Sequence, residues 1–459
     1  MAKERYTIEI TGGGSGGIGV GHIDGKTILI PFGVIGDVLE IHLTKIKAKY
    51  AWGAIDRIIA PSPARNEDPP CDRFDRCGGC DTIHMHYPMQ LQMKEREVKD
   101  CLHSIAKLHP PIGPIIGANR TTHYRNKVQL PVGQDKNGEI ITGFYAPKSH
   151  RIVEHDDCCI EPKGTDVIAK TLVQYMRDYG LKPYDEQQHT GTIRHLCIRN
   201  DQYNKKMVII VTNRPLPDTD ALVQRLREAS PNIISIYVNY NRDKTNVIMG
   251  RDFFKLFGQK HLTYQIFDLH FHVSPESFLQ IHTGQIEALY ASALDMAAIT
   301  KEDTVLDIYC GIGTITLCAA GRAKEVIGIE IVESAVKNAK NNARINGIEN
   351  ASFYAGDAAK ITQQLKQQGR KPDIILLDPP RKGCDEKMLQ LLAELAPKRI
   401  VYVSCNPATL ARDVLFLTQN GYDLAQVQPV DLFPHTSHVE TVVKLSLKKD
   451  TPKIETGNI

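Results

Sequence analysis

Cys405 follows a predicted strand, at a position where a thiol could act as a nucleophile. The run from Ile400 to Val403 is rich in β-branched and aromatic residues, as in a strand buried on both faces. Pro407 then ends the strand, and the next residues turn helical. Open α/β sheets bind ligands at the carboxyl ends of their strands, so this place suits a reactive group. A small cysteine buried in the core is the alternative, and position alone does not separate the two.

A second group of cysteines indicates a metal centre. Cys71, Cys77 and Cys80 have the spacing C-x5-C-x2-C, and two glycines between the last two let the backbone wrap around an ion or cluster. Three unrelated thiols would be the alternative. The short spacing in one segment favours shared ligation.

The fourth ligand would decide which metal is bound. Zinc would take a nearby nitrogen donor, which His84 or His86 could supply. A four-iron cluster would take a fourth thiolate, which Cys158 or Cys159 could bring from farther along the chain. The ligand types favour iron–sulfur over zinc. The spacing differs from the C-x3-C-x2-C pattern of radical-generating clusters.

The carboxyl-terminal part has the pattern of a nucleotide-binding α/β unit. Residues 305–309 predict a strand, and Cys310-Gly-Ile-Gly-Thr314 predicts its turn into a helix. The next strand, 325–329, ends in Glu330, about 20 residues after the glycines, where an acid can bind ribose hydroxyls. Thr316 occupies the position at which a dinucleotide fingerprint has its third glycine. This favours a smaller nucleoside cofactor over NAD.

Further acids follow the later strands of the same sheet. Asp357 comes after the predicted strand 351–355, and Asp378 directly follows the strand 374–377. Glu440 lies at the entry of the last predicted strand. Any one of these acids could be an ordinary cap or turn carboxylate. Their ordered series along one sheet indicates a ligand-binding edge.

The elements that must position these residues predict a multidomain chain. Short strands with glycine turns predict a small antiparallel β-barrel over 1–60. A cysteine segment, 61–100, and a central α+β domain, 101–282, follow. The regular alternation of strands and helices predicts an α/β Rossmann-like domain over 283–448, with a polar tail at 449–459.

Basic residues on predicted strands are compatible with RNA as a partner. Lys45, Lys47 and Lys49 alternate along one strand and so share a face. Arg125 and Lys127 are interleaved with aromatic residues, as cations and rings are in strands that bind RNA. A solvated sheet face explains each of them equally well.

Composition excludes membrane and disulfide-rich secreted classes. The chain is 42% hydrophobic and 24% charged with a formal net charge of +3, as in globular proteins. It has no run of about 18 apolar residues and no apolar stretch near its start that resembles an export signal. Eleven cysteines without such a signal predict thiols or metal ligands in the cytoplasm.

Four motifs together resemble those of S-adenosylmethionine-dependent methyltransferases, and more narrowly the RNA uracil-C5 methyltransferases of the RumA/TrmA group. The three cysteines and the barrel-like start look like the RumA branch, which has a TRAM domain (an OB-like barrel) and a 4Fe–4S cluster. The motifs are Asp307-Ile-Tyr-Cys-Gly-Ile-Gly313, Asp378-Pro-Pro-Arg381, Ser404-Cys-Asn-Pro407 and Phe433-Pro-His-Thr-Ser-His-Val-Glu440.

The resemblance implies a role for individual residues. Cys405 is similar to the family's nucleophile and Glu440 to its general base, while Phe278 resembles the ring that stacks on an extruded uracil. The start of the helix after Pro407 should help the thiol to ionise. His282 differs from the asparagine that relatives commonly carry. The implied contacts to S-adenosylmethionine are Gln280, Tyr309, Gly311, Glu330, Asp357 and Asp378, and the implied cluster ligands are Cys71, Cys77, Cys80 and Cys158.

The implied reaction is methyl transfer to C5 of a uridine in RNA, with 23S rRNA favoured, tRNA second, and no membrane or obligate protein partner. An RNA cytosine-C5 methyltransferase would be expected to have a Pro-Cys pair in the motif 378–381, and an exocyclic-amine methyltransferase a tyrosine in place of Arg381. A non-catalytic RNA-binding assembly factor is disfavoured by the intact pair of Cys405 and Glu440.

Overall fold

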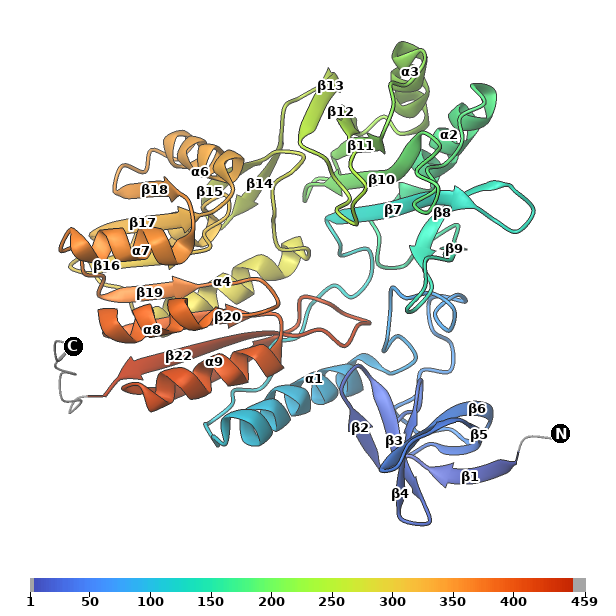
Figure 1. Cartoon of the computed structure of the whole chain (residues 1–459), viewed down its shortest axis with the longest axis horizontal. Helices are drawn as coiled ribbons and strands as arrows, with labels where there is room; N and C mark the ends of the chain where they lie inside the picture. Colours follow the sequence, from blue (N-terminus) through green and yellow to red (C-terminus); the bar gives the residue numbers. More distant parts are fainter. Residues whose placement is uncertain (1–3, 449–459) are drawn as a thin grey trace.

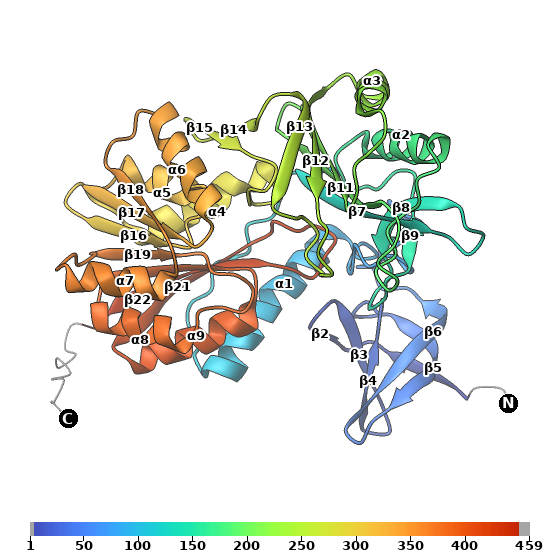
Figure 2. The same ribbon diagram turned by 45° about the horizontal axis from the view of Figure 1, so that its top comes forward.

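The computed structural model describes residues 4–448, so the predicted tail lies outside the described residues. Three large sheets and one two-stranded sheet make up the chain (Figure 1). Two views agree that the first two large sheets lie on one side of the molecule and the last on the other, with helix α1 between them (Figure 2). The multidomain architecture predicted from the sequence is confirmed.

The first sheet is a small barrel with the strand order β1-β5-β6-β4-β3-β2. Alternating isoleucines, such as Ile28 and Ile30, point into its core. A Cβ at Gly21 would lie 2.6 Å from the Glu9 carbonyl oxygen, so glycine allows β3 to pass close to β1 and the sheet to curl. The strands are β1 (Arg5–Glu9), β2 (Gly12–Gly14), β3 (Ile18–Ile23), β4 (Lys26–Ile30), β5 (Val38–Ile46) and β6 (Tyr50–Ala60).

Helix α1 (Tyr87–Cys101) follows the cysteine segment and continues as the π-helix η1 (Leu102–Ala106). Pro88 lies in its first turn, where its missing N–H costs nothing. The buried side of α1 is partly polar, because Gln90 and Lys94 are completely buried beside Val98.

The central sheet has the order β13-β12-β11-β10-β7-β8-β9, and only β11 and β12 run parallel. Helices α2 (Thr165–Asp178) and α3 (Thr219–Ala229) pack on one face through Leu172 and Leu222. The strands are β7 (Lys127–Gln134), β8 (Ile140–Tyr145), β9 (Ile152–Glu154), β10 (Ile193–Asn200), β11 (Lys206–Thr212), β12 (Ile233–Tyr240) and β13 (Asp252–Gly258).

A hairpin of β14 (Leu262–Ile266) and β15 (Leu269–Val273) connects the central sheet to helix α4 (Thr283–Ala297). The loop 274–282 between the hairpin and α4 carries Phe278 and Gln280. It therefore brings two predicted site residues to the boundary of the last sheet.

The last sheet has the order β18-β17-β16-β19-β20-β22-β21, with five parallel strands and β22 antiparallel to both of its neighbours. The strand order reverses at β16, which predicts a ligand crevice at the carboxyl ends of β16 and β19. The strands are β16 (Thr304–Ile308), β17 (Glu325–Glu330), β18 (Ala351–Ala355), β19 (Ile374–Leu377), β20 (Arg399–Ser404), β21 (Tyr422–Val430) and β22 (Glu440–Leu447).

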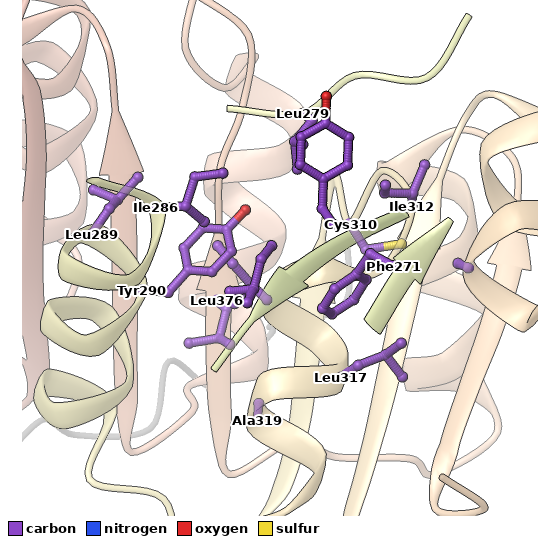
Figure 3. Packing of buried hydrophobic residues seen from close by; sticks show 14 of the residues in the cluster. Phe271, Leu279, Ile286, Leu289, Tyr290, Cys310, Ile312, Leu317, Ala319 and Leu376 are labelled. Atoms are coloured by element: carbon purple, nitrogen blue, oxygen red, sulfur yellow. The ribbon is translucent and has the colours of Figure 1, made fainter. Parts of the chain in front are cut away.

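Helices cover both faces of this sheet, which is why its strands are almost continuously apolar. Figure 1 shows α7, α8 and α9 along one face and α4 along the other. On the α4 side, Tyr290 packs near Leu317 and Phe271 in one core (Figure 3). The remaining helices are α5 (Thr314–Ala320), α6 (Glu333–Ile345), α7 (Ala358–Gln367), α8 (Glu386–Leu395) and α9 (Pro407–Gln419).

Candidate active site

The glycine turn after β16 lies at the point where the strand order reverses. Tyr309 has a φ of +71°, which residues other than glycine rarely adopt, and Gly313 opens α5 with a φ of +82°. The N–H groups of Tyr309 and Cys310 both donate to one carbonyl of β17, at 2.9 and 3.0 Å. Glu330, at the end of β17, accepts a hydrogen bond of 3.1 Å from the Gly311 N–H. These bonds fix the turn against the neighbouring strand.

Asp307 is buried in β16, and its carboxylate accepts a hydrogen bond from the Thr316 hydroxyl. Burial raises the pKa of Asp307 to about 7, although this hydrogen bond opposes the rise. Thr316 is the residue found in place of a third glycine. The structure gives it a partner that glycine could not bind.

A small pocket borders the turn at the carboxyl ends of β16 and β19. Phe278 lines it and is 69% exposed, so the ring is free to contact a ligand. Gln280 donates from Nε2 to Asp378 Oδ2 at 3.1 Å. The lining residues are Phe278, Leu279, Tyr290, Asp307, Tyr309, Cys310, Gly311, Ile312, Thr314, Ile315 and Asp378, several of which appear in Figure 3.

Four of the predicted cofactor residues thus come together, since Tyr309, Gly311 and Asp378 line the pocket and Gln280 binds Asp378. Glu330 holds the turn that borders the pocket. Asp357 does not line this pocket. It caps α7 instead, accepting a hydrogen bond of 3.0 Å from the Lys360 N–H.

The central domain positions the loop 274–282. Asn126 donates from Nδ2 to the Gln280 carbonyl at 2.8 Å. Arg199, buried in β10, donates to the carbonyls of Pro275 (3.1 Å) and Ser277. A buried guanidinium requires such partners, so these bonds fix the backbone on both sides of the exposed ring.

Cys405 and Glu440 lie opposite each other at the ends of two neighbouring strands. Ser404 of β20 pairs with Thr441 of β22 in antiparallel register, which places the next residues, Cys405 and Glu440, across from each other. Glu440 is 3% exposed. Among the described residues, its Oε2 atom has no hydrogen-bond partner.

The surroundings of Cys405 oppose ionisation of its thiol. Burial and the nearby carboxyls of Glu440 and Asp378 raise its pKa to about 11, against the effect of the adjacent Arg381 guanidinium. The help that the start of α9 should give to ionisation stays a prediction. Burial, with the Asp378 carboxyl as the next cause, also raises the pKa of Glu440 well above its usual range.

Arg381 links three parts of the site. Its carbonyl accepts hydrogen bonds from Asn406 Nδ2 (3.2 Å) and Thr409 Oγ1 (3.1 Å) at the start of α9. Its Nη2 lies 3.1 Å from His438 Nε2. The sequence indicated Arg381 only as part of a motif, and His438 was not singled out; their pairing depends on residues 57 positions apart in the chain.

The cysteines of the predicted metal centre gather around a shared apolar cluster. Cys71, Cys80, Cys158 and Cys159 all belong to it or pack against it, and Cys77 lies close enough to Cys71 for the two charges to interact. No three of these sulfur atoms lie within 4.8 Å of one another.

Both candidates for the fourth thiolate lie at this centre. Cys158 also approaches His155 and Glu161, whose ligand atoms lie with its own within 4.8 Å. Cys159 interacts with the charges of two of the three other cysteines. His84, the nitrogen donor of the zinc alternative, is buried and stacked on a phenylalanine ring.

Arg125 and Lys127 are both half-buried, and Arg125 lines a cavity together with Arg120 and Lys163. Arg125 forms a β-bridge with His282, and its side chain lies among Tyr124 and the thiols of the metal centre. Lys127 pairs with Arg199 across β7 and β10, and burial lowers its pKa to about 8. His282 stacks on Tyr124 at 4.8 Å between ring centroids. Binding of RNA by Arg125 and Lys127 remains a prediction.

Within residues 4–448, none of the helices has the length and apolar character needed to cross a membrane.

Comparison with known proteins identifies two families along the chain. Residues 86–448 match the family model described as tRNA (uracil-5-)-methyltransferase, and residues 1–55 match the TRAM domain. An uncharacterised RNA methyltransferase of Oceanobacillus iheyensis is 42% identical over 450 residues, covering 97% of each chain. A second, from Halalkalibacterium halodurans, is 42% identical over 435 residues and covers 94% of each chain.

Among solved structures, the tRNA (uracil-54, C5)-methyltransferase of Pyrococcus abyssi, in complex with S-adenosyl-L-homocysteine, is similar over 96% of this chain and 99% of its own. The TM-score is 0.75 and the sequence identity 26%. Together with the family model, which covers most of the chain, these relatives show that the protein belongs to the tRNA (uracil-5-)-methyltransferase family of RNA methyltransferases and begins with a TRAM domain.

Proposed function

We propose that this RNA methyltransferase transfers a methyl group from S-adenosylmethionine to C5 of a uridine in RNA. The observation that carries the proposal is the placement of Cys405 opposite Glu440 at the strand ends, beside the pocket that Asp378 lines. A nucleophile and a base on one side of a ligand pocket are what a C5 substitution through a covalent adduct requires.

The chemistry explains why both groups are needed. Uracil C5 is too weak a nucleophile to take a methyl group directly. The Cys405 thiol gives up its proton to solvent, the resulting thiolate forms a bond to C6, and the C5–C6 π electrons move into an enolate. C5 then bonds to the methyl carbon as the bond from that carbon to the sulfonium breaks. Glu440 takes the C5 proton, the C–H electron pair restores the C5–C6 double bond, and the thiolate leaves.

The electrostatics of the site fit these two roles. In the free protein the Cys405 thiol keeps its proton, and the Arg381 guanidinium beside it is the group that would stabilise the thiolate when RNA enters. A carboxylate whose pKa burial has raised, such as that of Glu440, is a correspondingly stronger base.

We assign the methyl donor to the pocket at the strand reversal. Tyr309, Gly311 and Asp378 line it, Gln280 binds Asp378, and Glu330 is the acid placed for ribose hydroxyls. Asp357 remains a proposed contact to the adenine amino group. Phe278, exposed at the same pocket, is proposed to stack on the extruded uracil. The S-adenosyl-L-homocysteine complex of the Pyrococcus abyssi relative supports S-adenosylmethionine as the methyl donor.

We propose 23S rRNA as the first target, because the cysteine centre resembles that of the RumA branch. Transfer RNA is the second candidate, and the family description and the name of the Pyrococcus abyssi enzyme favour it. The TRAM domain supports RNA as the substrate in either case.

The cysteine centre is proposed to hold a 4Fe–4S cluster through Cys71, Cys77, Cys80 and Cys158, with Cys159 as the alternative fourth ligand. The gathering of Cys71, Cys80, Cys158 and Cys159 around one apolar cluster supports this. When bound, such a cluster supplies a negatively charged, redox-active group.

Methyl transfer to purified 23S rRNA and tRNA tests the proposed function. Labelled S-adenosylmethionine is supplied, and the RNA is digested to nucleosides. The wild type and a Cys101→Ala control, which removes a thiol far from the site, should yield labelled 5-methyluridine. Cys405→Ala should lose at least about 10³-fold in rate, because the adduct cannot form. Label in 5-methylcytidine, or full activity of Cys405→Ala, would contradict the proposal.

A further inference from the structure

The segment that leads into Glu440 is held by the N-terminal half of the chain. We call residues 433–438 the His435 loop. His435 itself has a φ of +68°, a strained conformation that persists only where the surroundings hold it. The contacts from outside are Lys94 Nζ to the Phe433 carbonyl (2.9 Å), the Tyr124 hydroxyl to the Pro434 carbonyl (3.0 Å), the His435 N–H to Gln90 Oε1 (2.8 Å), and the N–H groups of Asp81 and Thr82 to the His435 carbonyl (3.0 and 3.1 Å).

Of the contacts that the N-terminal half makes to this loop, the one made by Asp81 lies nearest in sequence to Glu440. Its Oδ2 accepts hydrogen bonds from the Ser437 hydroxyl (2.9 Å) and the Ser437 N–H (3.3 Å). The next residue, His438, lies 3.1 Å from Arg381, the cation beside the Cys405 thiol. Glu440 follows two residues later, at the start of β22.

Asp81 also directly follows Cys80, one of the proposed cluster ligands. A cluster bound by Cys80 would fix the backbone on the amino side of Asp81. The backbone N–H groups and the carboxylate of this segment would then hold the His435 loop in its strained form. The path from the metal centre to the base thus consists of the backbone from Cys80 to Asp81, the hydrogen bonds between Asp81 and Ser437, and the backbone from Ser437 to Glu440.

We propose that Asp81 is a positioning residue, which transmits the order of the cysteine centre to the His435 loop and so places Glu440 for removal of the C5 proton. This inference rests on the proposed uracil-C5 reaction. Asp81 touches neither the substrate nor the reacting atoms. The centre therefore contributes to catalysis by fixing the base, and no electron transfer through it is required.

The geometry predicts which step of the reaction slows when the contact between Asp81 and Ser437 is lost. Cys405 is carried by β20 and by the start of α9, which Asn406 caps, and the His435 loop reaches this part only indirectly, through the contact of His438 with Arg381. Addition of the thiolate and methyl transfer should therefore continue, while proton removal by Glu440 slows. The covalent complex between Cys405 and RNA should accumulate.

Three variants test this in the full-length, iron-loaded protein. Asp81→Ala removes both hydrogen bonds to Ser437. Ser437→Ala removes the hydroxyl bond and keeps the backbone bond, at a position far in sequence from the cysteines. Asp68→Ala removes an exposed carboxylate from the same segment and serves as the control. For each we measure iron per chain, kcat and KM, RNA adducts that survive SDS, and hydrogen exchange of the peptide that covers 433–440.

Both contact variants should keep the iron content of the wild type and lose about 10- to 100-fold in kcat, because a small displacement of a reacting group has effects of this size. Their KM values should stay within about twofold, which distinguishes a misplaced base from lost binding. Adducts should accumulate and exchange over 433–440 should be faster, while Asp68→Ala matches the wild type.

Wild-type kcat and exchange in Asp81→Ala would overturn the proposal. So would loss of adduct and methylation together, since that would indicate general damage to the site. The failure of the proposed function is distinguishable, because it would appear as absent 5-methyluridine in the wild type. The exchange measurement does not depend on activity.

Discussion

Buried carboxyl groups determine the charge of the site more than its single thiol does. Asp307, Asp378 and Glu440 end or begin strands of one sheet, and burial is the first cause of the raised pKa in all three. For Asp307 and Asp378 the pKa reaches about 7. These groups therefore titrate in the range in which the enzyme would work, and their protons couple stability to pH.

Replacement of Asp307 by asparagine should make stability less dependent on pH. The pKa of this group in the folded protein is about 7, above its ordinary value of 3.8, so the stability it contributes is complete below about pH 3.8 and is lost as the pH rises through about 7. The free energy of unfolding of the wild type should fall relative to Asp307→Asn in this window, by up to about 1.4 kcal/mol per pH unit. Urea unfolding at several pH values measures it.

Asp295→Asn provides the control for this series. Asp295 is an exposed acid that forms an ion pair with Arg322 on the surface. Its replacement should leave the pH dependence of the wild type unchanged. Parallel pH curves for the wild type and Asp307→Asn would show that Asp307 ionises as readily in the fold as in the unfolded chain.

For single residues, the sequence predicted positions in the chain but not the electrostatic surroundings. The motifs located Cys405, Asp378 and Glu440 in the chain, because each lies at a strand end that the local pattern reveals. The raised pKa of Cys405 was missed, since it arises first from burial and then from the carboxyl of Glu440 on the neighbouring strand. The spacing of residues near Cys405 in the sequence does not reveal a charge that the fold brings from a distant segment.

At the scale of elements, helix α1 illustrates the same limit. Lys94 and Asp431 form an ion pair of 2.7 Å with both side chains fully buried, 337 positions apart in the chain. Asp431 also accepts a hydrogen bond of 2.8 Å from the Tyr87 hydroxyl. A periodic pattern of apolar residues does not predict that polar residues of a helix are buried. Lys94 can be buried in α1 only because Asp431, from a distant loop, pairs with it. The strands of the last sheet, in contrast, follow from continuous apolar runs.

Lys94→Met should lower the free energy of unfolding by about 3–5 kcal/mol, because it leaves Asp431 buried without its cation. Lys99→Met, on the exposed side of the same helix, should stay within about 0.5 kcal/mol of the wild type. Urea unfolding of the three proteins measures both effects. Equal values for the two variants would mean that Tyr87 and the backbone alone satisfy Asp431.

At the scale of the molecule, the barrel lies across from the last sheet (Figure 2), and the turn between its strands β5 and β6 is cationic. Lys45, Lys47 and Lys49, between β5 and β6, are all exposed. Ile46, among them, is 64% exposed. Cations next to an exposed apolar side chain suit the phosphates and bases of RNA. The net charge of +3 does not reveal this, because the opposite charges are distributed over the rest of the chain.

A triple variant, Lys45→Ala, Lys47→Ala and Lys49→Ala, should weaken RNA binding chiefly at low salt. Each lost phosphate contact removes about 0.7 from the slope of log K against log salt for single-stranded RNA, so the slope should fall by up to about 2. At saturating RNA the rate of methyl transfer should be unchanged, since the hairpin contributes no residue to the pocket.

Three exposed lysines of the last domain, Lys340, Lys371 and Lys387, provide a control with the same change of net charge. Their replacement by alanine should leave the slope within error of the wild type. If both triple variants reduce the slope equally, RNA responds to the total charge of the protein. If only the barrel variant does, the TRAM domain holds the phosphates while the opposite side of the molecule carries out the chemistry, and each function can be altered separately.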